Sequence, residues 1–406
     1  MKMSPTANAG NLLLKNASVI IGDGRYLEHA DIHIEGERIH KITQNIDPTQ
    51  SDTVIDLSQK TILPGLMDAH VHLMFSGGPD PEEIQKYSDP LLTILAAVNA
   101  HKTLQAGFTT VRDTGARGFI DIALRTAIEQ GIVQGPRLFV SGHFICMTGG
   151  HGSRFGARQA DGVNECRKAA REQIRAGVDV VKVMATGGVL TRGTEPGAAQ
   201  LSEEEMRVMV EEAHKAGKIS SAHAHGTQGI KNALRAGIDS IEHGTYADDD
   251  ALEMMHEKGV FLAICIGATR APIVKTSSEG KVPDYVIQKN KEVLEHQLAT
   301  LKRAHEMGIN VVLGTDSGTP LNGHGNNAEE FEIFVEHGMS EMEAIIAGTS
   351  RVAKLLRIDD KLGTLEEGKI ADLIVVNSDP LTNISSLKEP IFVIKNGIIV
   401  KEPQDY

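Results

Sequence analysis

The stretch PGLMDAHVHL at residues 64–73 is an apolar run that contains two histidines. It predicts a strand over residues 66–72, which follows the turn signal of Pro64 and Gly65. Side chains two positions apart on a strand point to the same face, so His70 and His72 could grip one metal ion together. The alternative is that the two histidines lie in a core or loop without a metal. Metal-ligating residues on other strands would favour the metal site over this alternative.

Further strands are expected along the chain, separated by amphipathic stretches such as 162–176 and 202–217. They are predicted at residues 109–114, 137–145, 179–186, 219–225, 240–244, 261–266 and 310–316. The helix over 202–217 opens with Ser202 and Glu205, the spacing of a capping box. Eight strands that alternate with helices indicate parallel pairing, because parallel neighbours need long crossovers. The sequence therefore predicts an α/β fold with a (β/α)₈ TIM barrel over residues 65–358; an open doubly wound sheet is the alternative.

Both ends of the chain have the residue pattern of short β-strands. Residues 12–64 consist of short alternating segments, and residues 363–380 and 390–403 contain apolar runs broken by Asn396-Gly397, a hairpin signal. Neither end has enough strands to close a core by itself. We therefore expect residues 1–64 and 359–406 to form one small β-sandwich domain.

Composition excludes several classes of protein. Hydrophobic residues make up 41% and charged residues 23%, which is typical of a globular domain with a sizeable core. The net charge of -13 and the lack of a basic run argue against nucleic acid as a partner. No stretch approaches the roughly 18 apolar residues of a membrane span, and the start of the chain lacks a signal-peptide core. A cytoplasmic protein without membrane contact is expected, with Cys146, Cys166 and Cys265 reduced.

Other strand ends carry residues that suit a metal site. His223, His243 and Asp316 end the fifth, sixth and eighth predicted strands, where barrel active sites are built. Lys182 lies inside the apolar fourth strand, where a buried cation is costly. It points outward, pairs with a carboxylate, or has a chemical role. An ammonium has no lone pair for a metal, but a neutral amine can react with carbon dioxide and form a carbamate with two ligand oxygens.

These positions together resemble the amidohydrolase superfamily in its binuclear form. The matching elements are PGLMDAHVHL, the strand-borne Lys182, His223, IEHG with His243, LGTDSG with Asp316, and the late segment LGTLEEGKIADLIVV. The resemblance implies two divalent metal ions. His70, His72 and Asp316 would hold the more buried ion, His223 and His243 the more exposed one, and carboxylated Lys182 would bridge them. Zinc is expected from the mixed imidazole and carboxylate ligands, with manganese, cobalt and iron as alternatives.

The resemblance also implies a mechanism. A hydroxide between the metals would attack an amide, because the metals lower the pKa of bound water. Asp316 would be the catalytic residue, taking the proton of the hydroxide and passing it to the leaving nitrogen.

Three segments narrow the implied substrate. Residues 135–154, 180–193 and 221–249 resemble the branch of Xaa-Pro and Xaa-Arg/Lys dipeptidases and N-acyl amino acid hydrolases. The amide bond to a C-terminal amino acid would be cut, in a dipeptide or another small molecule. Candidates for binding the substrate at the mouth of the barrel are His143, His151, Arg154, His225, Tyr246 and Arg270. The arginines could equally be solvated, Tyr246 could pack on a helix start, and His143 could be a satisfied histidine of the barrel wall.

Several questions stay open at this level. The segment 267–291 is rich in Gly, Pro and Ser before it turns helical, and it is expected to be a specificity loop or lid, or a linker without a role in chemistry. A cyclic-amide hydrolase of the imidazolonepropionase or hydantoinase kind is the alternative activity, although mononuclear relatives of that kind generally lack a bridging lysine. A non-catalytic scaffold is a third reading, which the six filled ligand positions disfavour. A homo-oligomer is expected.

Overall fold

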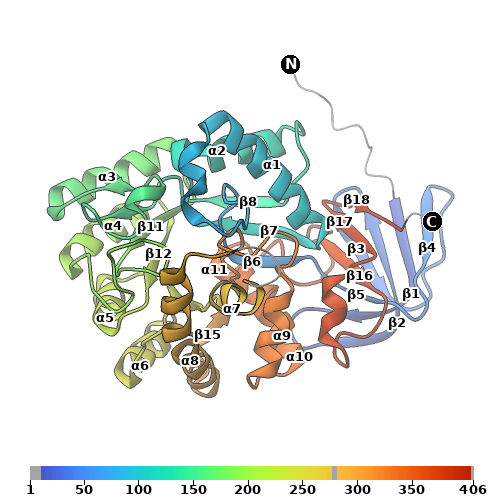
Figure 1. Ribbon diagram of the computed structural model, residues 1–406. Helices are drawn as coiled ribbons and strands as arrows, with labels where there is room; N and C mark the ends of the chain where they lie inside the picture. Colours follow the sequence, from blue (N-terminus) through green and yellow to red (C-terminus); the bar gives the residue numbers. More distant parts are fainter. Residues whose placement is uncertain (1–10, 277–280, 404–406) are drawn as a thin grey trace.

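The computed structural model describes residues 11–276 and 281–403 and places a barrel beside a sheet made from both chain ends (Figure 1). The predicted (β/α)₈ barrel is confirmed. Its strands are β6 (Leu66–Val71), β7 (Phe108–Asp113), β8 (Arg137–Val140), β11 (Val180–Met184), β12 (Ile219–Ala224), β13 (Ser240–His243), β14 (Phe261–Ala263) and β15 (Asn310–Val312). Every residue of β6, β7, β11, β12 and β13 is buried, as expected for parallel strands covered on both faces.

Hydrogen bonds outside the regular ladders close the barrel. Asp179 donates its backbone N–H to Val140 at 2.8 Å and joins β8 to the start of β11. Ala69 donates to Leu313 at 2.8 Å, and Asp316 donates to the carbonyl of His70 at 2.7 Å, so the last strand region meets the first. The closed barrel, rather than the open doubly wound sheet, is therefore the arrangement.

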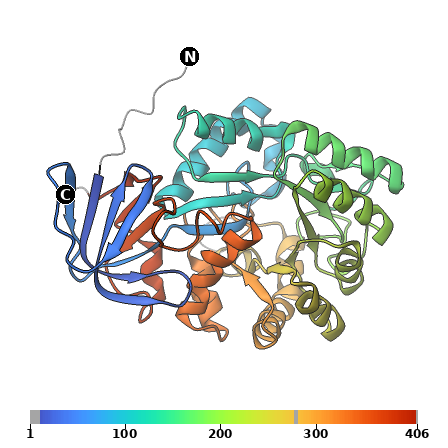
Figure 2. The ribbon, with the colours of Figure 1, turned by 180° about the vertical axis from the view of Figure 1, so that it is seen from behind.

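Helices surround the barrel strands, as the two opposite views show (Figures 1 and 2). They are α1 (Asp89–Gln105), α2 (Ile120–Glu129), α3 (Gly162–Ala176), α4 (Glu203–Lys215), α5 (Thr227–Ala236), α6 (Asp249–Lys258), α7 (Ile266–Lys275), α8 (Asp284–Glu306), α9 (Glu329–Glu336), α10 (Glu341–Ala347) and α11 (Ser350–Leu355). The predicted capping box is present at the start of α4, where Ser202 and Glu205 bond reciprocally. Short 3₁₀ turns occur at η1 (Pro81–Lys86), η2 (Arg117–Phe119), η3 (Ser153–Phe155) and η4 (Ile384–Lys388).

The third predicted strand is interrupted. Instead of one strand over 137–145, β8 ends at Val140, and the short β9 (Ile145–Cys146) pairs with β11 and with β10 (Arg158–Gln159). The cause is Asp121 on α2, whose carboxylate accepts the backbone N–H groups of Ser141 at 3.1 Å and Gly142 at 2.7 Å. These two N–H groups therefore point away from the ladder.

The segment 267–291, expected to turn helical only in its later part, is helical from its start. Helix α7 begins at Ile266, directly after β14, and α8 begins at Asp284. Residues 277–280 of the predicted segment lie outside the described residues. Pro272 lies inside α7, so the early Gly- and Pro-containing part of the segment is helical as well.

The chain ends contribute one sheet. Its strands are β1 (Asn11–Ile20), β2 (Tyr26–Glu35), β3 (Arg38–Thr43), β4 (Asp52–Asp56), β5 (Thr61–Pro64), β16 (Leu373–Val376), β17 (Phe392–Lys395) and β18 (Ile398–Lys401). β16 pairs antiparallel with β5, so the late segment returns to the early one as expected. Buried residues from both ends, including Ile32, Ile62 and Leu373, form one core around which the connected sheet folds. Residues 1–10 and 404–406 of the predicted sandwich lie outside the described residues.

The hairpin signal near the C-terminal end is confirmed. Asn396 and Gly397 join β17 to β18, and both have positive φ, at 51° and 72°. That is the backbone a two-residue hairpin turn requires, and it favours Asn-Gly.

Two further observations bear on the expected class of protein. Cys146, Cys166 and Cys265 are free and buried. Within residues 11–276 and 281–403, no helix combines the length and apolar character needed to cross a bilayer.

Candidate active site

A cavity lies at the carboxyl ends of the barrel strands and collects side chains from distant parts of the sequence. Six of its lining residues are the predicted metal ligands His70, His72, Lys182, His223, His243 and Asp316. Two more imidazoles, His151 and His225, also line it. These side chains meet because the strands of the barrel are parallel, so that all of their carboxyl ends lie at one rim.

His70, His72 and Asp316 form one side of the cavity. The Oδ1 atom of Asp316 lies 3.4 Å from Nε2 of His70 and 3.4 Å from Nε2 of His72. That oxygen is buried and has no hydrogen-bond partner among the described residues. Asp316 also has a φ of 54°, a left-handed conformation that is unusual outside glycine. An acceptor held without a donor in this way suits a cation.

The other ring nitrogens of the two histidines are already occupied. Nδ1 of His70 donates to Oε2 of Glu242 at 2.8 Å, and Nδ1 of His72 donates to the carbonyl of Gly115 at 3.1 Å. With the protons on Nδ1, the Nε2 atoms carry lone pairs toward Asp316. Burial lowers the pKa of the His72 imidazole to about 4, so this ring is neutral at pH 7.

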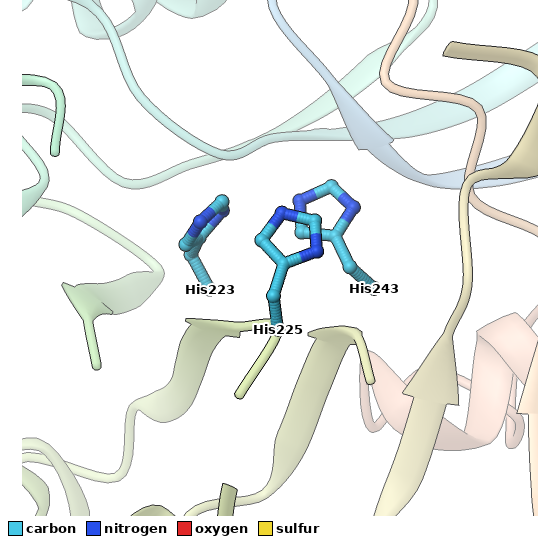
Figure 3. Close-up of side chains that lie close together, drawn as sticks. All are labelled: His223, His225 and His243. Atoms are coloured by element: carbon cyan, nitrogen blue, oxygen red, sulfur yellow. The ribbon is translucent and has the colours of Figure 1, made fainter. Parts of the chain in front are cut away.

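A second group consists of His223, His225 and His243, whose rings lie side by side at the strand ends (Figure 3). The ring centroids of His225 and His243 are 4.6 Å apart and nearly parallel, and the ring of His223 is 4.7 Å from each of them. One nitrogen from each ring lies within 4.8 Å of the others. Burial lowers the pKa of His225 to about 3, and it holds the pKa values of His223 and His243 well below their usual range. The cluster is therefore neutral and offers lone pairs.

Lys182 projects from the middle of β11 into the same cavity. It is 1% exposed, and within the described part of the chain its Nζ has neither an ion-pair partner nor a hydrogen-bond acceptor. Burial lowers its pKa to about 8, although the nearby carboxylate of Glu242 works in the opposite direction. Of the three readings left open by the sequence, an outward lysine and a lysine paired with a carboxylate do not describe this side chain.

Arg112 and Glu242 are two buried charged residues that contact the strands and side chains next to the cavity. The sequence analysis did not single them out. The guanidinium of Arg112 donates to Oε1 of Glu242 at 2.8 Å, and both side chains are fully buried. Arg112 also donates to the Ser240 hydroxyl at 2.9 Å, and Glu242 holds His70. The signal that could have found them is the one that marked Lys182, a charged residue inside an apolar strand.

Removal of Arg112 is expected to destabilise the protein strongly. Arg112→Met leaves the Glu242 carboxylate buried without its cation, which costs about 3–5 kcal/mol in free energy of unfolding. Urea unfolding measures this. The double variant Arg112→Met/Glu242→Gln should recover part of the loss, because it removes the unpaired charge as well. A change of less than about 1 kcal/mol for Arg112→Met would contradict the role given to this ion pair.

A third buried group, Asp68, ties the first strand to the last. Its carboxylate accepts the backbone N–H groups of His70 at 3.0 Å and Thr315 at 3.1 Å. It also accepts the Thr315 hydroxyl at 2.6 Å and the Asn327 amide at 2.8 Å. Asp68 therefore fixes the backbone next to both His70 and Asp316.

Of the predicted substrate-binding residues, the structure brings His151 and His225 to the cavity. The His151 ring lies 4.3 Å from the His223 ring, and its Nδ1 lies 2.9 Å from the Thr191 hydroxyl. A Cβ atom at Gly188 would stand 2.4 Å from the His151 ring, so only glycine fits there. Nδ1 of His225 lies 2.6 Å from the Thr245 hydroxyl.

The other four predicted residues do not line the cavity. Arg154 and Arg270 are half exposed and bind Glu82 and Glu336, each at 2.7–2.8 Å. Both arginines therefore match the alternative prediction, in which they are solvated surface residues.

His143 and Tyr246 are also held elsewhere. His143 packs edge-on against Phe119 at 4.6 Å, with its Nδ1 directed at the Gly156 carbonyl, as a satisfied histidine of the wall. Tyr246 packs against His296 of α8 at 4.8 Å and against an apolar cluster that includes Val286 and Val293 of α8.

One cavity residue carried no sequence signal. Asn290 on α8 is 3% exposed and lines the cavity, and among the described residues its side chain has no hydrogen-bond partner. Its amide is therefore available to a bound molecule.

Comparisons with known proteins give this arrangement a context. The sequence matches the model of the amidohydrolase family over residues 61–400. It is similar to an ochratoxinase of Aspergillus niger, with 34% identity over 430 aligned residues that cover 95% of this chain and 85% of that protein.

Solved structures extend the likeness to the fold. A Xaa-Pro dipeptidase with methionine bound in its active site matches with a TM-score of 0.89 and 35% identity, covering 96% of this chain and all of that one. A prolidase complexed with N-methylphosphonate-L-proline matches with a TM-score of 0.90 and 31% identity, covering 97% of this chain and all of that one. Both matches include the barrel and the sheet from the chain ends.

Proposed function

The chain belongs to the amidohydrolase family, and from this premise we propose that it is a metal-dependent hydrolase of dipeptides or N-acyl amino acids. The bond cleaved is the amide to the C-terminal amino acid. The observation that carries the proposal is the convergence of His70, His72, Lys182, His223, His243 and Asp316 on one cavity. The similarity to a Xaa-Pro dipeptidase and a prolidase supports this substrate class.

Two divalent ions, with zinc favoured, fit the donors present. His70, His72 and Asp316 would hold one ion, since the unpartnered Oδ1 of Asp316 lies 3.4 Å from Nε2 of each histidine. His223 and His243 would hold the other, with neutral imidazoles as ligands. Bound ions of this kind lower the pKa of water and polarise a carbonyl group.

Lys182 would bridge the two ligand groups as a carbamate. Its lowered pKa leaves part of the amine neutral at physiological pH. The lone pair of Nζ then adds to the carbon of carbon dioxide, and Nζ loses a proton, so the product carries two oxygens and one negative charge. The negative charge of the carbamate would be offset by the two divalent ions that the neutral imidazoles around it would hold.

Asp316 would move the proton during hydrolysis. It lies at the rim and remains ionised, since His70 and His72 outweigh the burial that alone would raise its pKa. Its carboxylate accepts the proton of the attacking water and delivers it to the leaving nitrogen. His151, His225 and Asn290 are placed to orient the substrate by hydrogen bonds, because all three line the cavity.

The walls of the cavity favour an apolar substrate. They include Phe75, Phe144, Phe155, Met184, Val189 and Leu190. Among the described residues that line the cavity, Asp316 supplies the one carboxylate, and it belongs to the proposed metal site. A lysine or arginine side chain of a substrate would therefore be buried without a partner, which is costly. We infer that Xaa-Pro and apolar N-acyl substrates are preferred to Xaa-Arg and Xaa-Lys.

A substrate panel with the zinc-loaded enzyme tests both the reaction and the preference. We expect kcat/KM for apolar dipeptides and N-acyl amino acids to exceed that for the Arg and Lys dipeptides by about 10²-fold. That factor corresponds to roughly 3 kcal/mol for an unpaired buried polar group. Faster hydrolysis of cyclic amides than of any dipeptide would point to the cyclic-amide alternative. Absence of hydrolysis across the panel would point to a scaffold.

A further inference from the structure

The hairpin of β2 and β3 carries two imidazoles and a carboxylate that take no part in the barrel cavity. They are His33, Glu35 and His40, and one ligand atom from each lies within 4.8 Å of the others. The hairpin belongs to the sheet from the chain ends, on the opposite side of the molecule from β11 and β12 in both views (Figures 1 and 2). This group is therefore separate from the proposed active site.

Strand alternation and a bulge bring the three side chains together. His33 and Glu35 are two residues apart on β2 and share a face, while Ile32 and Ile34 point into the core of the sheet. Across the hairpin, His33 pairs with Lys41 and Ile34 pairs with Ile39, so His40 is the extra residue of a bulge. A bulge re-aims a side chain, and here it sets His40 beside the other two.

A buried carboxylate orients His33. Nε2 of His33 donates to Oδ1 of Asp52 on β4 at 3.0 Å, and the other oxygen of Asp52 accepts the backbone N–H of Thr49 at 2.7 Å. The Asp52 side chain is fully buried, and His33 is 6% exposed. With the proton on Nε2, Nδ1 of His33 presents a lone pair to Glu35 and His40. Carboxylates orient metal-bound histidines in the same way.

The separations within the group suit a shared cation better than direct bonds. Nδ1 of His33 lies 3.7 Å from Oε1 of Glu35, and Nδ1 of His40 lies 3.6 Å from Oε2 of Glu35. Both distances exceed those of hydrogen bonds. They approach the roughly 3.3–3.4 Å between neighbouring ligand atoms around a tetrahedral ion with bonds of about 2.0–2.1 Å.

We propose that His33, Glu35 and His40 form an additional metal site on the terminal sheet, for a divalent transition ion such as zinc. Two imidazoles and one carboxylate suit zinc, copper or nickel rather than magnesium or calcium. The half-exposed side chains of Glu35 and His40 leave room for water to complete the coordination. The ion would join β2 to β3 across the bulge.

Counting zinc tests the proposal. Wild type, His40→Gln and Glu35→Gln are dialysed against zinc with the active site loaded, and the metal is measured per chain. His101→Gln, which removes an exposed imidazole of α1, is the matched control. We expect wild type and the control to hold one equivalent more than His40→Gln and Glu35→Gln, with equal kcat/KM in all four. Equal zinc content in all four proteins would overturn the proposal.

Imidazole nitrogen shifts give a second readout that does not depend on the count. Zinc is expected to shift the Nδ1 resonance of His33 in wild type and to leave it unchanged in His40→Gln. A His33 Nδ1 that stays protonated and does not respond to zinc in wild type would instead identify a plain ion pair with Glu35.

Discussion

Replacing Asp316 with Asn is expected to lower kcat/KM by about 10³- to 10⁴-fold, the upper range for loss of a general acid–base group. The side chain keeps its size and an oxygen at the rim, but an amide cannot accept the proton of the attacking water. Asn also tolerates the left-handed backbone that Asp316 adopts at a φ of 54°, so the fold should survive. Steady-state kinetics on an Xaa-Pro dipeptide, with urea unfolding alongside, measure the two effects separately.

The matched control is Asp250→Asn, an exposed aspartate of α6 that pairs with Lys231 at 3.0 Å. It should leave kcat/KM unchanged. Normal turnover by Asp316→Asn would contradict the role of Asp316 as the proton carrier.

Replacing Lys182 with Ala is expected to lower kcat by at least about 10³-fold. It should also reduce the metal content of the purified protein. The carbamate would supply one oxygen to the ion of each ligand group, and alanine supplies none. Activity assays and metal analysis on the same sample provide both readouts. Lys182→Arg should behave alike, because a guanidinium stays charged and cannot add to carbon dioxide.

Chemical rescue separates the chemistry of Lys182 from its packing. Acetate or propionate should restore part of the activity of Lys182→Ala, because a small carboxylate can occupy the vacated space and supply two oxygens. The control is Lys258→Ala, an exposed lysine at the end of α6, for which no change is expected. Full metal content and normal kcat in Lys182→Ala would exclude a bridging role for this residue.

The barrel and the rim residues were predictable because their signals are local. A strand fixes that His70 and His72 share a face, and a parallel barrel brings the ends of its strands to one rim. Their places at strand ends put His223, His243 and Asp316 at the rim, and the resemblance to the amidohydrolase superfamily implied that they are metal ligands. The β pattern of the two chain ends predicted that they meet in one domain, and β16 pairs with β5 accordingly.

What the sequence did not reveal depends on partners far away in the chain. Arg154 and Arg270 were expected to bind the substrate, but they pair with Glu82 and Glu336 and do not line the cavity. Asp121 on α2 interrupts the third strand through two hydrogen bonds that no local pattern announces. Asn290 reaches the cavity only because of how α8 packs. The two domain ranges, a homo-oligomer and a cytoplasmic location stay predictions.

Anomalous diffraction at the zinc edge, on crystals of the zinc-loaded protein, is the sharpest test of the proposed metal site. We expect two anomalous peaks in the barrel cavity, one beside His70, His72 and Asp316 and one beside His223 and His243. We also expect electron density that continues beyond Nζ of Lys182 toward both. A cavity without anomalous peaks, or a bare lysine amine turned away from them, would contradict the proposed site.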